Sequence, residues 1–200
     1  NQVKFEGSAP TIAAHAFSGV VAVVTYPSDD ASWTSDMKKN YGGTLDWKES
    51  GEKQQCGKTA YWEVKDGTLT ISGSGAVDNY DSAKQRPWNE SSLEINKVVV
   101  EDGITFVGDF AFYGMTNLAE IVLTDSVTSI GTYAFKNCSS LKEIILPKEL
   151  TEIKDSAFYG CAKLTSIAIP EKVKKIGDYA FSRCTALKAI SFKGDAPEIA

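Results

Sequence analysis

The sequence predicts an α/β solenoid, a right-handed coil of short parallel strands and short helical turns with a β-hairpin cap at its N-terminal end. One phrase occurs four times, its copies begin every 23 residues, and its apolar residues keep the same offsets in each copy. A fixed period of roughly 20 to 50 residues is the signature of a solenoid, in which one coil buries its apolar face only against its neighbours. The copies occupy residues 107–123, 130–146, 153–169 and 176–192.

Each copy is expected to contain two extended segments with a turn between them. Near its end, the pattern L-x-x-I-x-L places apolar residues at alternate positions, which favours a strand paired with the same segment of adjacent coils. The preceding A-F-x-x-C stretch has helical i, i+3/i+4 spacing and predicts a short helical turn. One phenylalanine from each copy should join a hydrophobic spine, formed by Phe112, Phe135, Phe158 and Phe181.

Glycine occupies the coil corner in three of the four copies. Gly108, Gly131 and Gly177 follow the first extended segment, where a Cβ would crowd a tight bend. Lys154 takes this position in the third copy, so a positive φ is not required there.

Three of the cysteines share one repeat position. Cys138, Cys161 and Cys184 are 23 residues apart, and Met115 replaces them in the first copy, as a small buried hydrophobic site tolerates. The spacing of ~4.8 Å between strands does not exclude a disulfide, but we expect a column of buried thiols because a bridge would disturb the core. Cys56 stands alone in a polar stretch and is expected to be a free thiol. The C-x-x-C spacing typical of zinc sites does not occur.

Residues 1–50 are predicted to form the terminal coil and C-terminal cap of an upstream repeat array. Three pairs show that residues 1–13 match residues 188–200: Phe5 with Phe192, Pro10 with Pro197, and Ile12 with Ile199. An array end leaves unpaired backbone groups and an uncovered core. We therefore expect residues 1–20 to cover an open array end, either within the chain or by head-to-tail self-association between molecules.

The rest of this first segment departs from the repeat. Residues 21–27 are β-branched and end in proline, which predicts a strand. Ser32 is expected to cap a short helix through Asn40, which Gly42 and Gly43 terminate. Residues 44–47 are then expected to be extended.

A polar linker at residues 51–59 leads to a second array. Alternating apolar residues on both sides of Asp66-Gly67 predict a hairpin, and we assign residues 60–100 to an N-terminal cap. Trp88 is expected to fold over the first coil. Residues 101–200 are predicted to be the repeats, truncated at the last coil.

Composition argues against several classes of partner. The net charge is −5 and only two arginines occur, whereas nucleic-acid binding requires a basic face rich in bidentate donors. No apolar run approaches the ~20 residues that span a bilayer, so membrane insertion is not predicted. The chain starts at Asn1 without a charged and apolar leader, which favours a fragment of a larger protein whose signal peptide is absent or removed.

The sequence predicts neither an enzyme nor a cofactor or metal site. His15 is the only histidine, so it is the one residue that could serve as the histidine of a catalytic triad, and a cluster of histidine metal ligands is not possible. Asp78, Asn79 and Asp81 have calcium-like spacing but lack the 12-residue loop that ends in glutamate, which favours turn chemistry. Glu120 and Glu143 would lie about 5 Å apart in adjacent coils, near the geometry of retaining glycosidases, but an open solenoid face provides no cleft.

The phrase I-G-x-x-A-F-x-x-C-x-x-L-x-x-I-x-(I/L)-P, repeated every 23 residues, resembles the BspA-type bacterial leucine-rich repeats. The D-G-x-L-T-I-S-G-x-G opening is similar to the cap that precedes such arrays. The resemblance covers about residues 60–200, with residues 1–20 as a remnant coil. It implies a leucine-rich-repeat solenoid in a secreted or cell-surface bacterial protein, with adhesion or matrix binding in some members and no catalytic residues.

If the geometry of that family holds, the outward residues of the strands form a concave binding face. Its central column is apolar over four coils, as in Val122 and Ile145, and could mark a protein-binding stripe. The alternative is that β-branched residues simply pack along neighbouring strands. The candidate face consists of Lys97, Val99, Glu101, Glu120, Val122, Thr124, Glu143, Ile145, Ser166, Ala168, Ser191 and Lys193.

These features predict a binding module that recognises a host or neighbouring-cell protein or glycan through a repeat face. The alternative is a structural spacer that holds another domain away from the cell wall. A binder should expose an apolar or aromatic patch on one face, whereas a spacer should have a uniformly polar surface.

Overall fold

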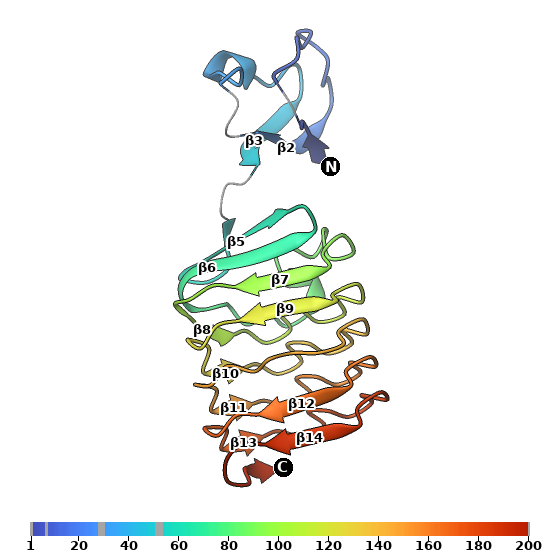
Figure 1. Cartoon of the computed structure of the whole chain (residues 1–200). Coiled ribbons are helices and arrows are strands. Elements are labelled where there is room, and N and C mark those ends of the chain that lie inside the picture. Colours follow the sequence, from blue (N-terminus) through green and yellow to red (C-terminus); the bar gives the residue numbers. More distant parts are fainter. Residues whose placement is uncertain (1, 7, 28–30, 51–53, 200) are drawn as a thin grey trace. The chain divides into compact units, whose positions relative to one another are not determined.

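The computed structural model describes residues 2–6, 8–27, 31–50 and 54–199. The chain divides into two compact units, Asn1–Lys53 and Gln54–Ala200 (Figure 1). The division falls within the predicted linker, of which residues 51–53 lie outside the described part, as do residues 1 and 200 at the outer bounds of the predicted domains. The assignment of residues 1–50 to an upstream array, and of residues 60–100 and 101–200 to a cap and its repeats, stays a prediction.

The first unit contains a three-stranded parallel sheet. Its strands are β1 (Gln2–Lys4), β2 (Val21–Pro27) and β3 (Thr44–Ser50), in the order β1-β2-β3. Val21 pairs with Thr44, so β2 and β3 are related by the same 23-residue step as the repeats. The strands expected at residues 21–27 and 44–47 are therefore present.

The prediction of a helix at residues 32–40 is wrong. Only one turn of 3₁₀ helix forms there, η1 (Ser35–Met37). Ser32 does not cap it, because its Oγ accepts the backbone N–H of Ala9 at 2.7 Å. Trp33 is buried, and its ring lies 4.9 Å from the ring of Phe5. This aromatic contact, rather than helical hydrogen bonding, holds the segment around η1 in place.

The second unit begins with the expected hairpin. After β4 (Gln54–Gln55), strands β5 (Thr59–Lys65) and β6 (Thr68–Ala76) pair antiparallel, and both turn residues, Asp66 and Gly67, have positive φ. Two positive φ values define the type I′ turn, whose twist matches that of the paired strands.

Trp88 joins this cap to the first coil, as predicted. After the 3₁₀ turn η2 (Ala83–Gln85), Trp88 is fully buried, and its Nε1 donates to the carbonyl oxygen of Ala111 at 2.9 Å. Its ring stacks on Phe112 with 5.9 Å between the centroids.

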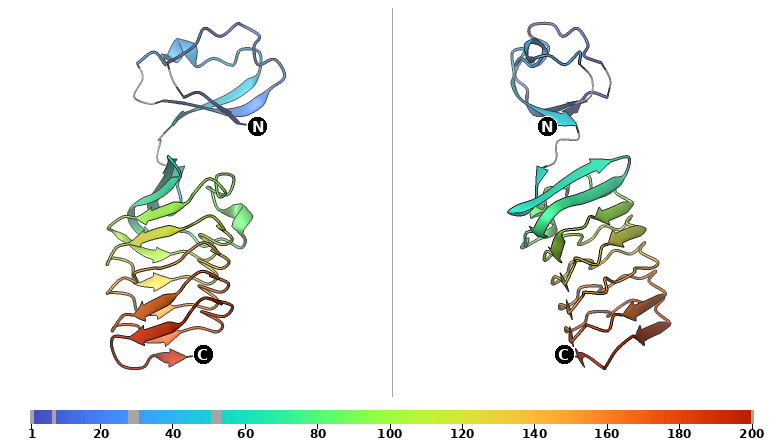
Figure 2. Two further views of the ribbon diagram at one scale, coloured as in Figure 1. Left: turned by 45° about the vertical axis from the view of Figure 1, so that its right-hand side comes forward. Right: turned by 60° about the vertical axis from the view of Figure 1, so that its left-hand side comes forward.

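The coils that follow stack parallel strands in two columns (Figures 1 and 2). Partners within each column are 23 residues apart and in register, as in Ile130 with Ile153 and Ile167 with Ile190. One column continues from β6 through β8 (Ile104–Val107), β10 (Ser129–Ile130), β11 (Glu152–Ile153), β13 (Lys175–Ile176) and β15 (Glu198–Ile199). The other contains β7 (Lys97–Val100), β9 (Glu120–Leu123), β12 (Ser166–Ile169) and β14 (Ala189–Phe192).

The prediction of helical turns is wrong. The unit is a β-solenoid with little helix rather than an α/β coil. Two residues of each A-F-x-x-C turn have positive φ, for example Tyr133 and Asn137. Alternate backbone N–H groups in the turn donate to the next coil, as Phe135 does to Ala157 at 2.8 Å. These left-handed residues interrupt an α-helix, and the intercoil bonds satisfy the donors that a helix would pair internally.

The predicted phenylalanine spine is present. Consecutive rings of Phe112, Phe135, Phe158 and Phe181 stack with centroid distances of 5.2, 5.1 and 5.5 Å. The first three side chains are fully buried. Each ring thus covers the next, which is how a narrow coil obtains a continuous core.

The cysteines form the predicted column of buried, free thiols. Cys138, Cys161 and Cys184 each donate through Sγ to the carbonyl oxygen of a phenylalanine in the preceding coil, at 3.1, 3.2 and 3.1 Å. Burial raises the pKa of Cys138 to about 12, and the hydrogen bond with Cys184, together with burial, raises the pKa of Cys161. Cys56 is also free, but it is buried in the cap, where burial and then Asp78 raise its pKa to about 12.

Cys56, Cys138 and Cys161, whose thiol pKa values are raised, should make the unit less stable in alkali. Below pH 9.0, the usual thiol pKa, Cys138 is protonated in both folded and unfolded chains and its contribution is complete. Between that value and about 12 only the unfolded thiol ionises, so stability should fall by about 1.4 kcal/mol per pH unit for each such thiol. Urea unfolding at about pH 8 and about pH 10 measures this slope. A Cys138→Ala variant should show a shallower slope, and an equal slope in both proteins would contradict the burial of this thiol.

Candidate binding face

Outward-pointing residues of the strand column β7, β9, β12 and β14 form an exposed surface, which we call the strand face. Alternation holds in three of the coils, since Ile121, Ile144 and Ile167 are buried while the residues next to them point outward. In β14 all four residues are exposed. Val122 is 41% exposed and Ile145 is 85% exposed. The strand face therefore carries a short apolar stripe at these two side chains, and its role as a binding site stays a prediction.

The central column changes character along the coils. Val99 is half-buried, whereas Ala168 and Ser191 are exposed. Apolar exposure is thus greatest at Val122 and Ile145, in the middle of the repeat array.

The column beside it is charged at its first end. Lys97 forms an ion pair with Glu120 at 2.6 Å, while Glu143 and Ser166 are exposed. Glu120 is therefore held by a lysine of the preceding coil. The ion pair with Lys97 gives Glu120 a structural role. It differs from the two facing carboxylates of a glycosidase cleft.

The third column is mixed. Glu101 and Lys193 are exposed, and the hydroxyl groups of Thr124 and Ser126 lie 2.9 Å apart. Pro147 is buried, so it contributes little to the surface.

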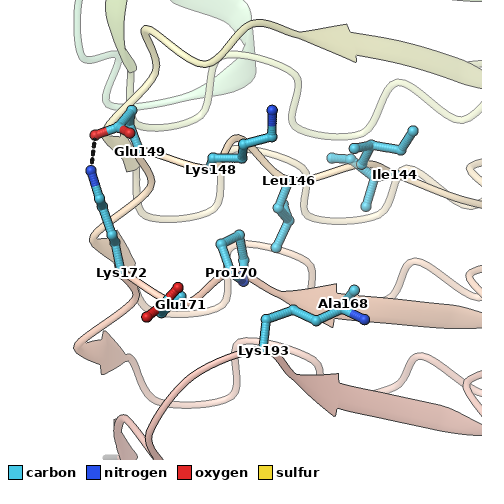
Figure 3. Close-up of a pocket in the computed structure, with 10 residues that line it drawn as sticks. Ile144, Leu146, Lys148, Glu149, Ala168, Pro170, Glu171, Lys172 and Lys193 are labelled. Carbon is cyan, nitrogen blue, oxygen red and sulfur yellow. Dashed lines mark hydrogen bonds and ion pairs between the residues drawn. The ribbon is translucent and has the colours of Figure 1, made fainter.

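A pocket of about 420 Å³ opens on the strand face between residues 144–149 and residues 168–172 of the next coil, and Lys193 reaches it from the coil after that (Figure 3). It lies beside residues 143–146, which form no strand, so the ladder on this face is interrupted between β9 and β12. Apolar side chains line its centre and charged side chains its rim. The lining residues are Ile144, Ile145, Leu146, Lys148, Glu149, Ala168, Pro170, Glu171, Lys172 and Lys193.

Charges on the rim alternate from coil to coil. Lys148 pairs with Asp125 at 3.3 Å, and Lys172 pairs with Glu149 (Figure 3). Hydrogen bonds from the backbone N–H and side chain of Lys148 lower the pKa of Asp125. Three lysines and two glutamates thus surround an apolar floor, an arrangement that can hold an apolar group and orient polar groups beside it.

The pocket brings together only part of the predicted face. Ile145, Ala168 and Lys193 line it, whereas the predicted residues of β7 and β9 lie outside it along the column. Sequence reasoning missed the four charged rim residues Lys148, Glu149, Glu171 and Lys172. The available signal was the opposite charge at the 23-residue step, because Lys148 precedes Glu171 and Glu149 precedes Lys172 by one coil.

The described residues contain no group of three or more histidine, cysteine, aspartate or glutamate side chains that could hold a metal ion. His15 is exposed in a turn. Asn79 uses its Oδ1 to accept the N–H of Asp109 at 2.8 Å, and the N–H of Asp81 donates to Gln85 at 2.7 Å. The Asp81 contact is local, whereas the Asn79 contact joins the cap to the first coil, 30 residues further along the chain.

A family model described as the BspA type leucine rich repeat region matches residues 90–200, in six copies. The chain belongs to the BspA-type leucine-rich repeat family. The resemblance seen in the sequence is thereby confirmed. The match also covers the strand β7, which the sequence assigned to the cap.

Solved structures of bacterial leucine-rich repeat proteins resemble this BspA-type chain. A leucine rich cell surface protein from Faecalibacterium prausnitzii A2-165 is 25% identical, with a TM-score of 0.59 over 86% of this chain and 48% of that one. The leucine rich repeat protein of T. pallidum is 27% identical, with a TM-score of 0.51 over 69% of this chain and 71% of that one. A leucine-rich repeat protein from Eubacterium ventriosum ATCC 27560, 24% identical with a TM-score of 0.57 over 72% of this chain and 43% of that one, shares the fold.

A comparison with functionally curated proteins found no match. Among the described residues of this BspA-type chain, no helix has the length and apolar character needed to cross a membrane.

Proposed function

We propose that this chain is a non-catalytic binding module of a secreted or cell-surface bacterial protein. It recognises a protein or glycan of a host or neighbouring cell through the strand face. The observation that carries this proposal is the exposed apolar stripe at Val122 and Ile145, which continues into a pocket with a charged rim. A structural spacer has no need of such a stripe, since a uniformly polar surface would keep it soluble.

The arrangement of the strand face supports recognition of a protein surface. Protein interfaces combine an apolar centre with a polar rim, and a few central side chains carry most of the binding energy. Ile145 is the best placed of these, because it is 85% exposed and its neighbours Ala168 and Pro170 line the same pocket. The lysines and glutamates around it would set the orientation of the partner.

The location and the partner of the whole protein are part of the proposal. The similar protein from Faecalibacterium prausnitzii is described as a cell surface protein, and this chain spans 48% of its length and 43% of the Eubacterium ventriosum protein. The predicted head-to-tail self-association through repeat ends also belongs here.

A double substitution tests the strand face. Val122→Glu with Ile145→Glu should abolish adhesion without unfolding, because both side chains point outward and the new carboxylates would be desolvated at the centre of the interface. Adhesion can be measured with microspheres that are coated with the whole chain and applied to cultured epithelial cells and to bacterial cells.

The matched control is Thr116→Glu with Thr185→Glu, which adds the same two charges at exposed positions outside the strand face. The control should adhere as the unsubstituted protein does. If the folded strand-face variant adheres equally well, the strand face is not the binding site, and the spacer becomes the better interpretation.

A further inference from the structure

A second surface of the repeats carries aromatic and cationic side chains along the A-F-x-x-C turns. We call it the aromatic ridge. Contacts link most of its members from coil to coil: Phe110 lies 4.9 Å from Tyr133, and Lys136 lies over the rings of both Tyr133 and Tyr159, at 4.5 and 4.6 Å. Tyr179 belongs to the ridge by its position, two repeat steps after Tyr133. The ridge consists of Phe110, Tyr113, Tyr133, Lys136, Tyr159, Tyr179 and Arg183.

The backbone of the turn does not explain these aromatic residues. Phe110, Tyr133 and Tyr179 have φ values of 58°, 58° and 56°, in the left-handed region that bulky side chains rarely adopt, and Ser156 takes this position in the third copy. The other left-handed position of the same turn holds Gly114, Asn137 and Gly160, residues that this conformation favours or tolerates well, and Arg183 in the fourth copy. Aromatic residues at a strained position call for another reason, and strained residues often mark functional surfaces.

The core does not explain them either. Tyr179 is 70% exposed, and Phe110, Tyr113, Tyr133 and Tyr159 are only half-buried. The buried ring of each turn is instead the phenylalanine of the spine, two residues after the left-handed position. The ridge therefore presents ring surface and phenolic hydroxyl groups to the solvent.

Two cationic side chains contact the tyrosine rings of the ridge. Lys136 is held between two tyrosine rings, and Arg183 lies 5.5 Å from the centre of the Tyr159 ring. Within the described residues, neither cation forms an ion pair with a carboxylate. Cation–π contacts restrain both side chains while leaving their N–H groups able to donate to a ligand.

Carboxylates precede the left-handed column in three of the four copies. Asp109, Asp155 and Asp178 each precede a left-handed residue of the turn. The Oδ1 atoms of Asp109 and Asp155 accept the backbone N–H groups of Thr132 and Asp178, at 2.7 and 2.9 Å. These bonds hold the two carboxylates in place, and their Oδ2 atoms are not used in them.

We propose that the aromatic ridge binds a linear, uncharged polysaccharide. Sugar rings present C–H faces that pack on aromatic rings, and their hydroxyl groups both donate and accept hydrogen bonds. The ridge offers at least one aromatic ring in each of the four copies, with carboxylate acceptors and cationic donors near the rings. Successive coils advance by the strand spacing of ~4.8 Å, so consecutive sugar units can each meet a ring of the ridge.

Other partners fit this surface less well. An anionic polymer would be repelled by the three aspartates and by the net charge of −5. A protein partner usually contacts about 20–30 residues on each side, whereas the ridge consists of seven. The proposal is independent of the strand face, whose residues lie on another segment of each coil.

Native electrophoresis in gels that contain soluble mannan, xylan or mixed-linkage β-glucan tests the proposal with the whole chain. Retardation is expected in at least one of these gels. The variant Tyr133→Asn with Tyr179→Asn should bind at least tenfold more weakly, while it should fold normally because asparagine tolerates positive φ. Tyr133→Phe with Tyr179→Phe keeps both rings and should retain most of the retardation.

The remaining outcomes are decisive. The strand-face variant Val122→Glu with Ile145→Glu should be retarded like the unsubstituted protein, which separates this proposal from the proposed function. The proposal is overturned if none of the three neutral polysaccharides retards the chain, or if the asparagine variant is retarded fully. Retardation by polygalacturonate alone would assign the ridge to an acidic polysaccharide. Loss of cell adhesion in the asparagine variant, without retardation in any gel, would assign it to a protein.

Discussion

Replacing Phe135 with alanine is expected to lower the free energy of unfolding by roughly 3–5 kcal/mol. The side chain is fully buried, and its ring is stacked between Phe112 at 5.2 Å and Phe158 at 5.1 Å. Removing it leaves a cavity in the middle of the spine. The neighbouring coils cannot collapse into this cavity, because backbone hydrogen bonds on both sides fix their separation.

Two matched variants locate the effect. Phe181→Ala should cost less, because Phe181 is only half-buried and the structure gives it one stacked neighbour, Phe158 at 5.5 Å. Lys142→Ala should be close to neutral, because its side chain is exposed. Urea unfolding of the whole chain, followed through the transition of the Gln54–Ala200 unit, gives the three values. Equal midpoints for Phe135→Ala and Lys142→Ala would contradict the spine.

Features that depend on the repeat period could be predicted from the sequence. Stacking of identical coils places equivalent residues one above another, so the columns of Phe135 and Cys138 followed directly from the 23-residue step. The hairpin was predictable for a local reason, because Asp66-Gly67 suits a turn with two positive φ values.

The helical turns could not be rejected from spacing alone. The A-F-x-x-C segment does contain bonds between residues three apart, such as Cys138 N–H to Phe135, at 3.1 Å. What prevents a helix is the alternation of these bonds with intercoil bonds, such as Phe135 N–H to Ala157. The competing partner lies one coil away in space, and the i, i+3/i+4 pattern carries no information about it.

The candidate site was predictable in part for a similar reason. Alternation along a strand predicts which side chains point outward, and it placed Val122 and Ile145 correctly on the surface. The pocket depends instead on the interrupted ladder between β9 and β12 and on the ion pair of Glu149 with Lys172. Both are properties of neighbouring coils together. The aromatic ridge was missed because its signal is a backbone conformation, the positive φ of Tyr133 and its equivalents.

The coil corner shows how closely the coils approach one another. A Cβ added to Gly131 would lie 2.5 Å from Asp109 Oδ1, and one added to Gly177 would lie 2.2 Å from Asp155 Oδ1. Backbone atoms crowd both corners as well, since the added Cβ would lie 2.7 Å from Asp109 N at Gly131 and 2.6 Å from Asp155 N at Gly177, which supports the expected crowding. Thr132 takes the equivalent position in the coil before Lys154, which removes the aspartate side chain there but not the backbone contact.

Gly108 is the most restricted of these glycines, and Gly108→Ala should lower the free energy of unfolding by about 3 kcal/mol or more. Its Cβ would lie 1.9 Å from the carbonyl oxygen of Asp78 and 2.7 Å from its carbonyl carbon. A backbone obstacle cannot rotate away as a side chain can, so the loop at Asp78 has to move. That movement would strain the hydrogen bond from the Asp78 N–H to Cys56, which joins the cap to this loop at 2.8 Å.

Gly114→Ala is the matched control for this substitution. Gly114 has a φ of +68° and no atom within 4 Å of an added Cβ, so alanine there should cost only about 1 kcal/mol of backbone strain. Urea unfolding at neutral pH compares the two variants, and Cys56 reports on the cap, since its thiol should react with a labelling reagent faster in Gly108→Ala alone. Equal stability losses in both variants, with Cys56 unreactive in each, would show that the contact between the first coil and the cap can relax, and that the glycine at this corner is not required by the packing of the coils.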